Sequence, residues 1–93
     1  AAARDPAGVD FAAEFRAPGH VHLLRAAPSL AERTGHTELG VALAERAGRP
    51  GAAVVCEMLD DAGGALPVAA ARAYADRHGL AFVEGADVVA ALG

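Results

Sequence analysis

The sequence contains no lysine, isoleucine, asparagine, glutamine or tryptophan, and it has one cysteine. One cysteine cannot form an internal disulfide, so we expect a reduced, cytoplasmic protein. The eight basic residues are all arginine and are scattered along a chain of net charge −4, so no basic patch for nucleic acid is expected. The missing residue types indicate a coding bias toward alanine, arginine and glycine.

Long apolar and long polar runs are also missing. The longest apolar stretches, residues 51–56 and 88–92, are far shorter than the roughly 20 residues that cross a membrane. Residues 1–5 lack a basic region followed by an apolar one, so neither a signal peptide nor a membrane partner is expected. Charged residues make up 22% of the chain, which argues against disorder.

What the chain has in quantity is alanine. Of the 50 apolar residues, 26 are alanine, which leaves few large side chains for a core. The length of 93 residues allows one domain. A chain this short and alanine-rich can require a partner surface to complete its core.

The hydrophobic pattern predicts helices that alternate with short strands. Helices are expected at 10–15 (capped by Asp10), at about 35–47, at 67–78 and at 86–92, with Gly48 and Gly79 as stops for the second and third. Strands are expected at 20–26, 52–59 and 80–83, and a loop or hairpin turn at 60–64. This alternation indicates the α/β class, three-layered if something covers both faces of the sheet.

The first segment that can carry chemistry is Arg33-Thr34-Gly35-His36-Thr37-Glu38, where a loop enters the predicted 35–47 helix. Gly35 lets a ligand approach the backbone, and the first N–H groups of a helix attract anions, phosphate above all. Arg33 adds a fork of donors, and Thr37 adds a hydroxyl. His36 could ligate a metal or transfer a proton. The alternative is a capped helix start with a solvated arginine and histidine.

The second segment is Cys56-Glu57, inside an apolar strand. A carboxylate there is costly to bury unless it is paired. Glu57 therefore faces a partner arginine, or belongs to a site that perturbs its protonation, or faces water at a strand edge. Cys56 is predicted to be a small buried hydrophobe, because nothing nearby in sequence marks it as a thiolate.

The third segment is His20-Val21-His22. Two histidines at strand spacing i, i+2 lie on one face and could hold a zinc ion with further ligands. The alternative is a solvent-exposed strand face that binds no metal.

Taken in order, these segments resemble the C-terminal half of 3,4-dihydroxy-2-butanone 4-phosphate synthase, a family of riboflavin biosynthesis. The residues that carry the resemblance are Arg16-Ala17-Pro18-Gly19-His20-Val21, Leu24-Arg25-Ala26, Arg33-Thr34-Gly35-His36-Thr37-Glu38, 44–48, Val54-Val55-Cys56-Glu57, Arg77-His78-Gly79-Leu80 and Ala86-Asp87-Val88-Val89. The Arg-x-Gly-His-Thr-Glu segment followed by Cys-Glu about twenty residues later is specific in combination.

The resemblance implies a three-layer sandwich with a mixed sheet, of which residues 1–93 supply about half, the C-terminal half of the domain. The family converts ribulose 5-phosphate to 3,4-dihydroxy-2-butanone 4-phosphate and formate, with Mg²⁺ (or Mn²⁺), in a homodimer. By resemblance, His36 is a metal ligand and His20 and Glu57 are catalytic. The substrate-binding residues that it implies are Arg33, Thr34, Gly35, His36 and Thr37.

The sequence also departs from the family. The acidic loop of the N-terminal half, which supplies another metal-binding Glu and a catalytic Asp, is absent. His22-Leu23 replace a usual Phe-Pro, and Ser29-Leu30 stand where a Gly-Gly-Val pattern is usual. Residues 64–67 do not keep the family's Thr-Met-Ala-Arg, and the closing Ala-Tyr-Arg is lost.

Three functions are compatible with these residues. The chain is an enzyme half that works with a complementary acidic N-terminal half, or a degenerate paralogue that serves as a phosphosugar-binding or dimerisation module. The third possibility is a small metal-binding protein that uses His20, His22 and His36. Survival of the whole set of family residues favours the first, since a decaying site would have lost one of them; the missing half and the altered turn favour the second.

Overall fold

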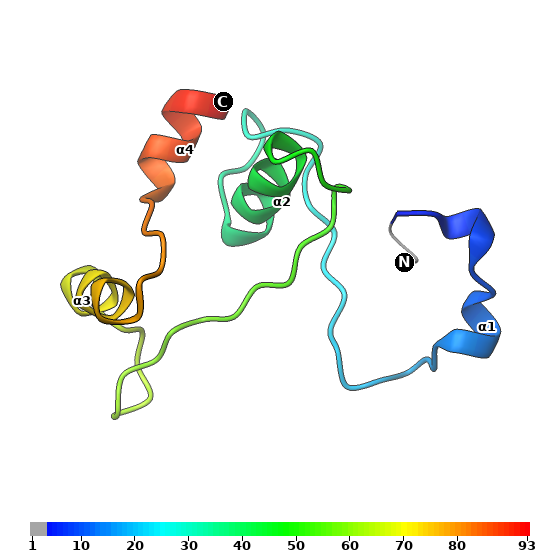
Figure 1. Ribbon diagram of the computed structural model, residues 1–93, viewed down its shortest axis with the longest axis horizontal. Helices are drawn as coiled ribbons and strands as arrows, with labels where there is room; N and C mark the ends of the chain where they lie inside the picture. Colours follow the sequence, from blue (N-terminus) through cyan, green and yellow to red (C-terminus); the bar gives the residue numbers. More distant parts are fainter. Residues whose placement is uncertain (1–3) are drawn as a thin grey trace.

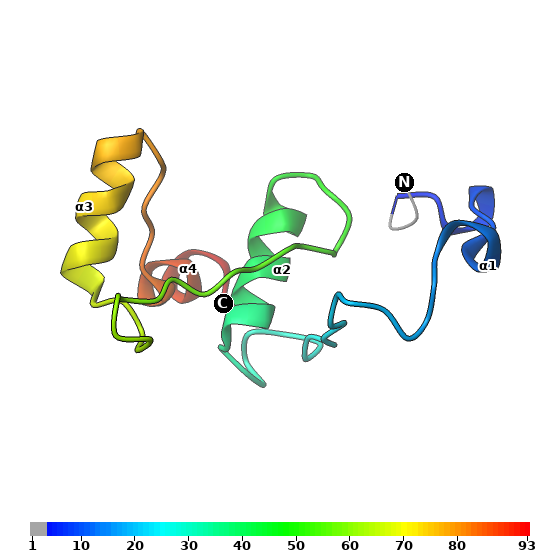
Figure 2. The same ribbon diagram turned by 90° about the horizontal axis from the view of Figure 1, so that it is seen from below.

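The computed structural model describes residues 4–93 of the chain. These residues form a 3-10 turn and four α-helices joined by long coils (Figure 1). The elements are η1 (Pro6–Gly8), α1 (Phe11–Glu14), α2 (His36–Arg46), α3 (Val68–His78) and α4 (Gly85–Leu92). Within the described part, α2 and α4 are the elements that pack against each other, and both views show them side by side (Figures 1 and 2).

The four predicted helices are confirmed, with ends shifted by a residue or so. Asp10 caps α1, because its side chain accepts a hydrogen bond from the Ala13 N–H at 3.4 Å. Helix α3 is rich in alanine, the best helix former, and ends at Gly79 in the left-handed conformation with φ +64°. Gly48, with φ +74°, follows the end of α2 in the same way.

The three predicted strands are wrong. Across residues 4–93 no strand is present, and the segments 20–26, 52–59 and 80–83 run as coil. Each strand of a ladder needs a neighbour to accept and donate its backbone hydrogen bonds. An apolar pattern in the sequence identifies a segment that could join a sheet. It does not provide the neighbouring strand that the segment must pair with.

The mixed-sheet, three-layer sandwich is therefore not the architecture of the described chain. Residues 4–93 are helical and contain no sheet. The one trace of β pairing between residues 4 and 93 is an isolated antiparallel bridge between Leu59 and Ala65. This bridge closes the predicted 60–64 turn, where Asp60 Oδ1 accepts from the N–H groups of Ala62 at 2.9 Å and Gly64 at 2.8 Å.

The core of the described chain is small. Ala75 and Val88 are its buried apolar residues, each 5% exposed. The radius of gyration is 15.8 Å, whereas a compact chain of this length has about 12 Å. The accessible surface is 7756 Å², against roughly 5000 Å² for a compact protein of this mass. The structure contains no helix in the described range with the length and apolarity to cross a membrane.

Candidate functional site

The candidate site is the start of α2. Gly35 is the N-cap residue, in an extended conformation, and its carbonyl accepts the first intrahelical bond from the Leu39 N–H at 2.9 Å. The first N–H groups of an α-helix, here those of His36 and Thr37, have no intrahelical acceptor, and the N-cap residue Gly35 has no side chain that could accept from them. This end of α2 therefore carries the partial positive charge that attracts anions.

Glu38, the third residue of α2, is the buried charged residue of the described chain, at 3% exposure. Its Oε2 accepts a hydrogen bond from the Ala27 N–H at 2.9 Å. Its Oε1 accepts one from Arg33 Nη1 at 3.0 Å, and the two groups form an ion pair. One carboxylate thus ties the loop that precedes α2, at two points, to the first turn of the helix.

The hydrogen bond from the Ala27 N–H is the main reason that the pKa of Glu38 is lower than its ordinary value. Burial acts in the opposite direction, and the backbone N–H groups of Glu38 and Gly35 and the charge of Arg33 add to the lowering. The carboxylate is therefore ionised at neutral pH, and its bonds are charge-assisted.

Gly35 leaves room for this carboxylate and for its arginine partner. A Cβ at Gly35 would lie 2.8 Å from Glu38 Oε1 and 2.9 Å from Arg33 Nη1, closer than a Cβ tolerates. Both atoms belong to flexible side chains, but the Glu38 carboxylate is buried and bonded to Ala27. A side chain at position 35 would therefore have to displace a group that is held in place.

The structure brings together the five residues predicted to bind substrate. Arg33 lies beside the helix start with its side chain 64% exposed, although one of its nitrogens is bonded to Glu38. Thr34 and His36 are exposed, and Gly35 and Thr37 are half-buried. The predicted anion site therefore offers its polar groups to solvent at one end of one helix.

The two residues predicted to be catalytic are not brought to this helix end. His20 lies in the coil before α2 and Glu57 in the coil after it, and both are exposed. No hydrogen bond or ion pair in the described chain joins either side chain to residues 33–37. The coil before α2 contacts the helix at Ala27, and the coil after it contacts the helix beside Gly40 through Ala53 and Val55, so neither contact is made by His20 or Glu57.

A metal centre is likewise not assembled by residues 4–93. They contain no group of three or more His, Cys, Asp and Glu side chains that could hold a metal ion, so His20, His22 and His36 do not form one. A hard divalent cation takes several oxygen ligands, and one imidazole does not replace them. By itself, the donor set of the described residues does not fit Mg²⁺.

Cys56 differs from its prediction. It is a free cysteine and is exposed, so the prediction of a small buried hydrophobe is wrong. The thiol is left uncovered although neighbouring Val55 lies against Gly40 of α2, and Val54 is 99% exposed.

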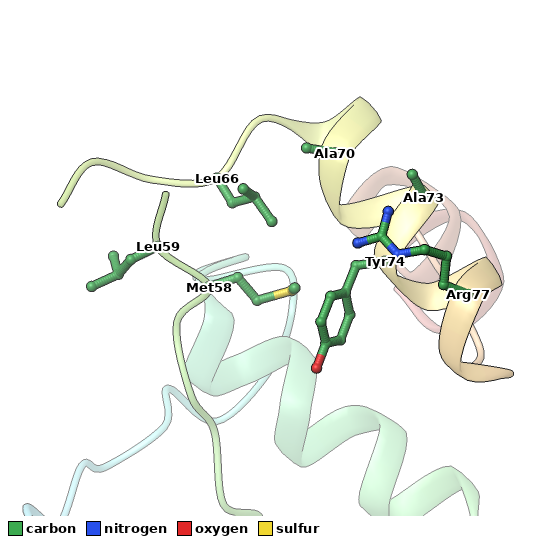
Figure 3. Close-up of a pocket in the computed structure, with 7 residues that line it drawn as sticks. All are labelled: Met58, Leu59, Leu66, Ala70, Ala73, Tyr74 and Arg77. Atoms are coloured by element: carbon green, nitrogen blue, oxygen red, sulfur yellow. The ribbon is translucent and has the colours of Figure 1, made fainter. Parts of the chain in front are cut away.

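A shallow apolar hollow lies elsewhere, between the 58–66 hairpin and α3 (Figure 3). Its lining residues are Met58, Leu59, Leu66, Ala70, Ala73, Tyr74 and Arg77. None of them belongs to the predicted site, so the hollow is distinct from the start of α2.

Sequence reasoning missed Glu38, to which it assigned no role. The signal was present, because a glutamate at the third helical position commonly reaches back toward the N-cap and the loop before it. The partner on Ala27 lies eleven residues earlier, and no spacing rule predicts that contact.

Comparison with known proteins identifies relatives of the chain. A family model for 3,4-dihydroxy-2-butanone 4-phosphate synthase matches residues 2–91. The synthase of Methanosarcina mazei is 57% identical over 86 residues, which are 90% of this chain and 35% of that protein. The synthase of Archaeoglobus fulgidus is 54% identical over 83 residues, 87% of this chain and 35% of that protein.

A more distant relative is the riboflavin biosynthesis protein RibBA of Mycobacterium ulcerans, 42% identical over 88 residues, which are 91% of this chain and 20% of that protein. The chain therefore spans about a third of the length of the two synthases, and less of the third relative. No solved structure matches it. Because the family model covers nearly all of the sequence, this chain belongs to the 3,4-dihydroxy-2-butanone 4-phosphate synthase family.

Proposed function

We propose that this chain is the phosphosugar-binding half of a synthase that converts ribulose 5-phosphate to 3,4-dihydroxy-2-butanone 4-phosphate and formate. Its membership of the family supports this reaction, and its length supports the need for a second part. The missing part is the acidic N-terminal half, and the complete synthase is a homodimer. The five carbons of the substrate become four in the product and one in formate, so no other carbon compound is consumed.

The observation that carries the proposal is the start of α2. The N–H groups of His36 and Thr37 point out of the helix without intrahelical acceptors, beside the guanidinium of Arg33. A guanidinium has five N–H donors, and one is engaged by Glu38. The remaining donors and the helix end suit the oxygens of a phosphate group, with the Thr37 hydroxyl as a further donor.

His36 is proposed to bind a divalent cation, Mg²⁺ or Mn²⁺. Its exposed imidazole supplies one ligand, and we assign the others to carboxylates of the acidic half. When bound, such a cation supplies positive charge that stabilises negative charge on the sugar oxygens.

His20 and Glu57 are proposed to carry protons. The reaction needs enolisation, in which a proton leaves a carbon atom and is later returned, and imidazole and carboxylate groups suit both steps. Within residues 4–93 both side chains are exposed and no hydrogen bond or ion pair engages them, so they are available for a substrate.

The test is formate release by a completed domain, which we define as the Methanosarcina mazei synthase in which this chain replaces the matched 35%. With ribulose 5-phosphate and Mg²⁺, the completed domain should release formate in a coupled assay, and the isolated chain should release none. Formate from the isolated chain would contradict the proposal. A folded completed domain that binds phosphate and forms no formate would favour the degenerate phosphosugar-binding module instead.

A further inference from the structure

We infer that Glu38 is a positioning residue for the substrate phosphate: its buried carboxylate holds Arg33 Nη1 at 3.0 Å, so that the guanidinium lies beside Gly35 at the start of α2. The inference rests on the proposed function, because Arg33 is the residue proposed to bind the phosphosugar. Glu38 itself does not touch the substrate in this arrangement.

The two ends of the ion pair have very different surroundings. The Glu38 side chain is 2% exposed, whereas that of Arg33 is 64% exposed. An exposed pair of long side chains contributes little, since both must be ordered for one contact. Here one partner is already fixed, because Glu38 Oε2 is bonded to the Ala27 N–H. Only the arginine has to be ordered by the contact.

The geometry of guanidinium makes this contact useful for binding. The group is planar and its five N–H donors point in fixed directions, so holding one nitrogen restricts the others. If the guanidinium of Arg33 is already ordered, phosphate binding does not have to pay the entropy cost of ordering that side chain, and the affinity for phosphate is higher. Glu38 thus acts on phosphate affinity through Arg33.

The space at Gly35 is part of the same arrangement. A Cβ at this position would lie within 3.0 Å of both members of the ion pair. The absence of a side chain at Gly35 is therefore what lets Arg33 and Glu38 meet directly in front of the first turn of α2. The pair is packed against the proposed anion site.

The direction in which phosphate affinity changes when Glu38 loses its charge distinguishes positioning of Arg33 from direct repulsion between Glu38 and the phosphate. Removing a negative charge near a bound phosphate should strengthen phosphate binding by Coulomb's law. Loss of positioning should weaken it. Glu38→Gln keeps the shape and an oxygen for the Ala27 N–H while removing the charge that orders Arg33. The matched control is Glu32→Gln, because Glu32 is an exposed carboxylate next to Arg33 in the same loop.

The experiment is a titration of the completed domain with inorganic phosphate, in the parent, Glu38→Gln, Arg33→Ala and the double variant. We expect Glu38→Gln to weaken phosphate binding about fivefold in the parent background and to have no further effect once Arg33 is alanine. Glu32→Gln should leave the affinity unchanged or slightly raise it. In turnover assays Glu38→Gln should raise the KM for ribulose 5-phosphate by a similar factor, with kcat changed less than about twofold.

Several outcomes would overturn the inference. Phosphate binding that is unchanged or tighter in Glu38→Gln contradicts positioning, and an equal loss in the Arg33→Ala background shows that Glu38 acts on the fold alone. If Glu38→Gln does not fold, Arg33→Lys replaces it, since it keeps the charge but not the planar fork; unchanged phosphate affinity in Arg33→Lys also overturns the inference. Absence of formate with intact coupling between Arg33 and Glu38 overturns only the proposed reaction.

Discussion

At the scale of single residues, the start of α2 depends on one buried carboxylate whose two oxygens each have a partner. Glu38 is bonded to the Ala27 N–H and to Arg33, so the charge is buried with compensation. Removal of either partner would leave a buried charge incompletely satisfied. Residues 33–37 were predicted as a site because their polar groups can reach a ligand in solvent. Glu38 is buried and bonds to the loop before α2, so sequence reasoning gave it no role.

Gly35→Ala tests the contact between Arg33 and Glu38 by adding a methyl group next to it. In the completed domain, the added methyl group should push Glu38 and Arg33 apart and weaken binding of inorganic phosphate about three- to tenfold. The control is Gly64→Ala, whose Cβ would lie at ordinary distances of 3.4 and 3.6 Å from the Asp60 carboxylate oxygens. Equal phosphate affinities in the two variants, measured by titration calorimetry, would contradict the expectation.

His36→Ala and Glu57→Gln should separate the metal role from the proton role. In the completed domain, His36→Ala is expected to abolish Mg²⁺-dependent formate release. Glu57→Gln should lower kcat by about a hundredfold or more with little change in phosphate affinity, because it removes a proton carrier and leaves the phosphate site intact. Full activity of His36→Ala, or a large loss of phosphate binding in Glu57→Gln, would refute these roles.

At the scale of secondary structure, the helix ends were predicted correctly from neighbouring residues, whereas the strands, which depend on distant partners, were not. The end of α3 at Gly79 and the cap of α1 at Asp10 are fixed by neighbours within four residues, and both were predicted from the sequence. A strand depends on a partner that can lie anywhere in the chain or outside it. The segment 52–59 has the composition of a buried strand, but it runs as coil with Val54 fully exposed.

The same distinction applies to the candidate site. Residues 33–37 are contiguous, so the entry to one helix places them together, and that grouping was predictable. His20 and Glu57 lie 16 and 20 residues from His36 and Thr37, respectively, and only packing between coils would bring them to the site. The described chain lacks that packing, and its α2–α4 contact does not involve either residue.

The end of α3 gives a prediction for this scale. Gly79 has φ +64°, a conformation that costs alanine about 1 kcal/mol and asparagine less. In urea unfolding of the completed domain, Gly79→Ala should therefore lower the free energy of unfolding by about 1 kcal/mol, and Gly79→Asn by less. No difference between the two variants would mean that the left-handed cap at residue 79 is not retained in the completed domain.

At the scale of the whole molecule, the chain exposes apolar side chains that a compact domain would cover. Leu23 is 88% exposed, Val21 81% and Val54 99%, all in the two long coils of Figure 1. Single exposed apolar residues are common on proteins, but here they coincide with a core of very few buried residues. Residues 4–93 by themselves therefore bury little apolar surface.

This exposure predicts that the isolated chain is marginally stable or self-associates. In sedimentation velocity at micromolar concentration, it should form concentration-dependent oligomers, and its thermal transition should be broad. Replacing two of the most exposed apolar residues, as Leu23→Ser with Val54→Ser, should reduce the association without lowering helicity, because neither residue lies in a helix. Ala52→Ser with Ala53→Ser is the control, since it adds the same hydroxyls and removes little apolar surface. A monomer with a sharp, concentration-independent transition would show that the isolated chain suffices for a stable fold, and it would remove the argument from stability for an acidic N-terminal half.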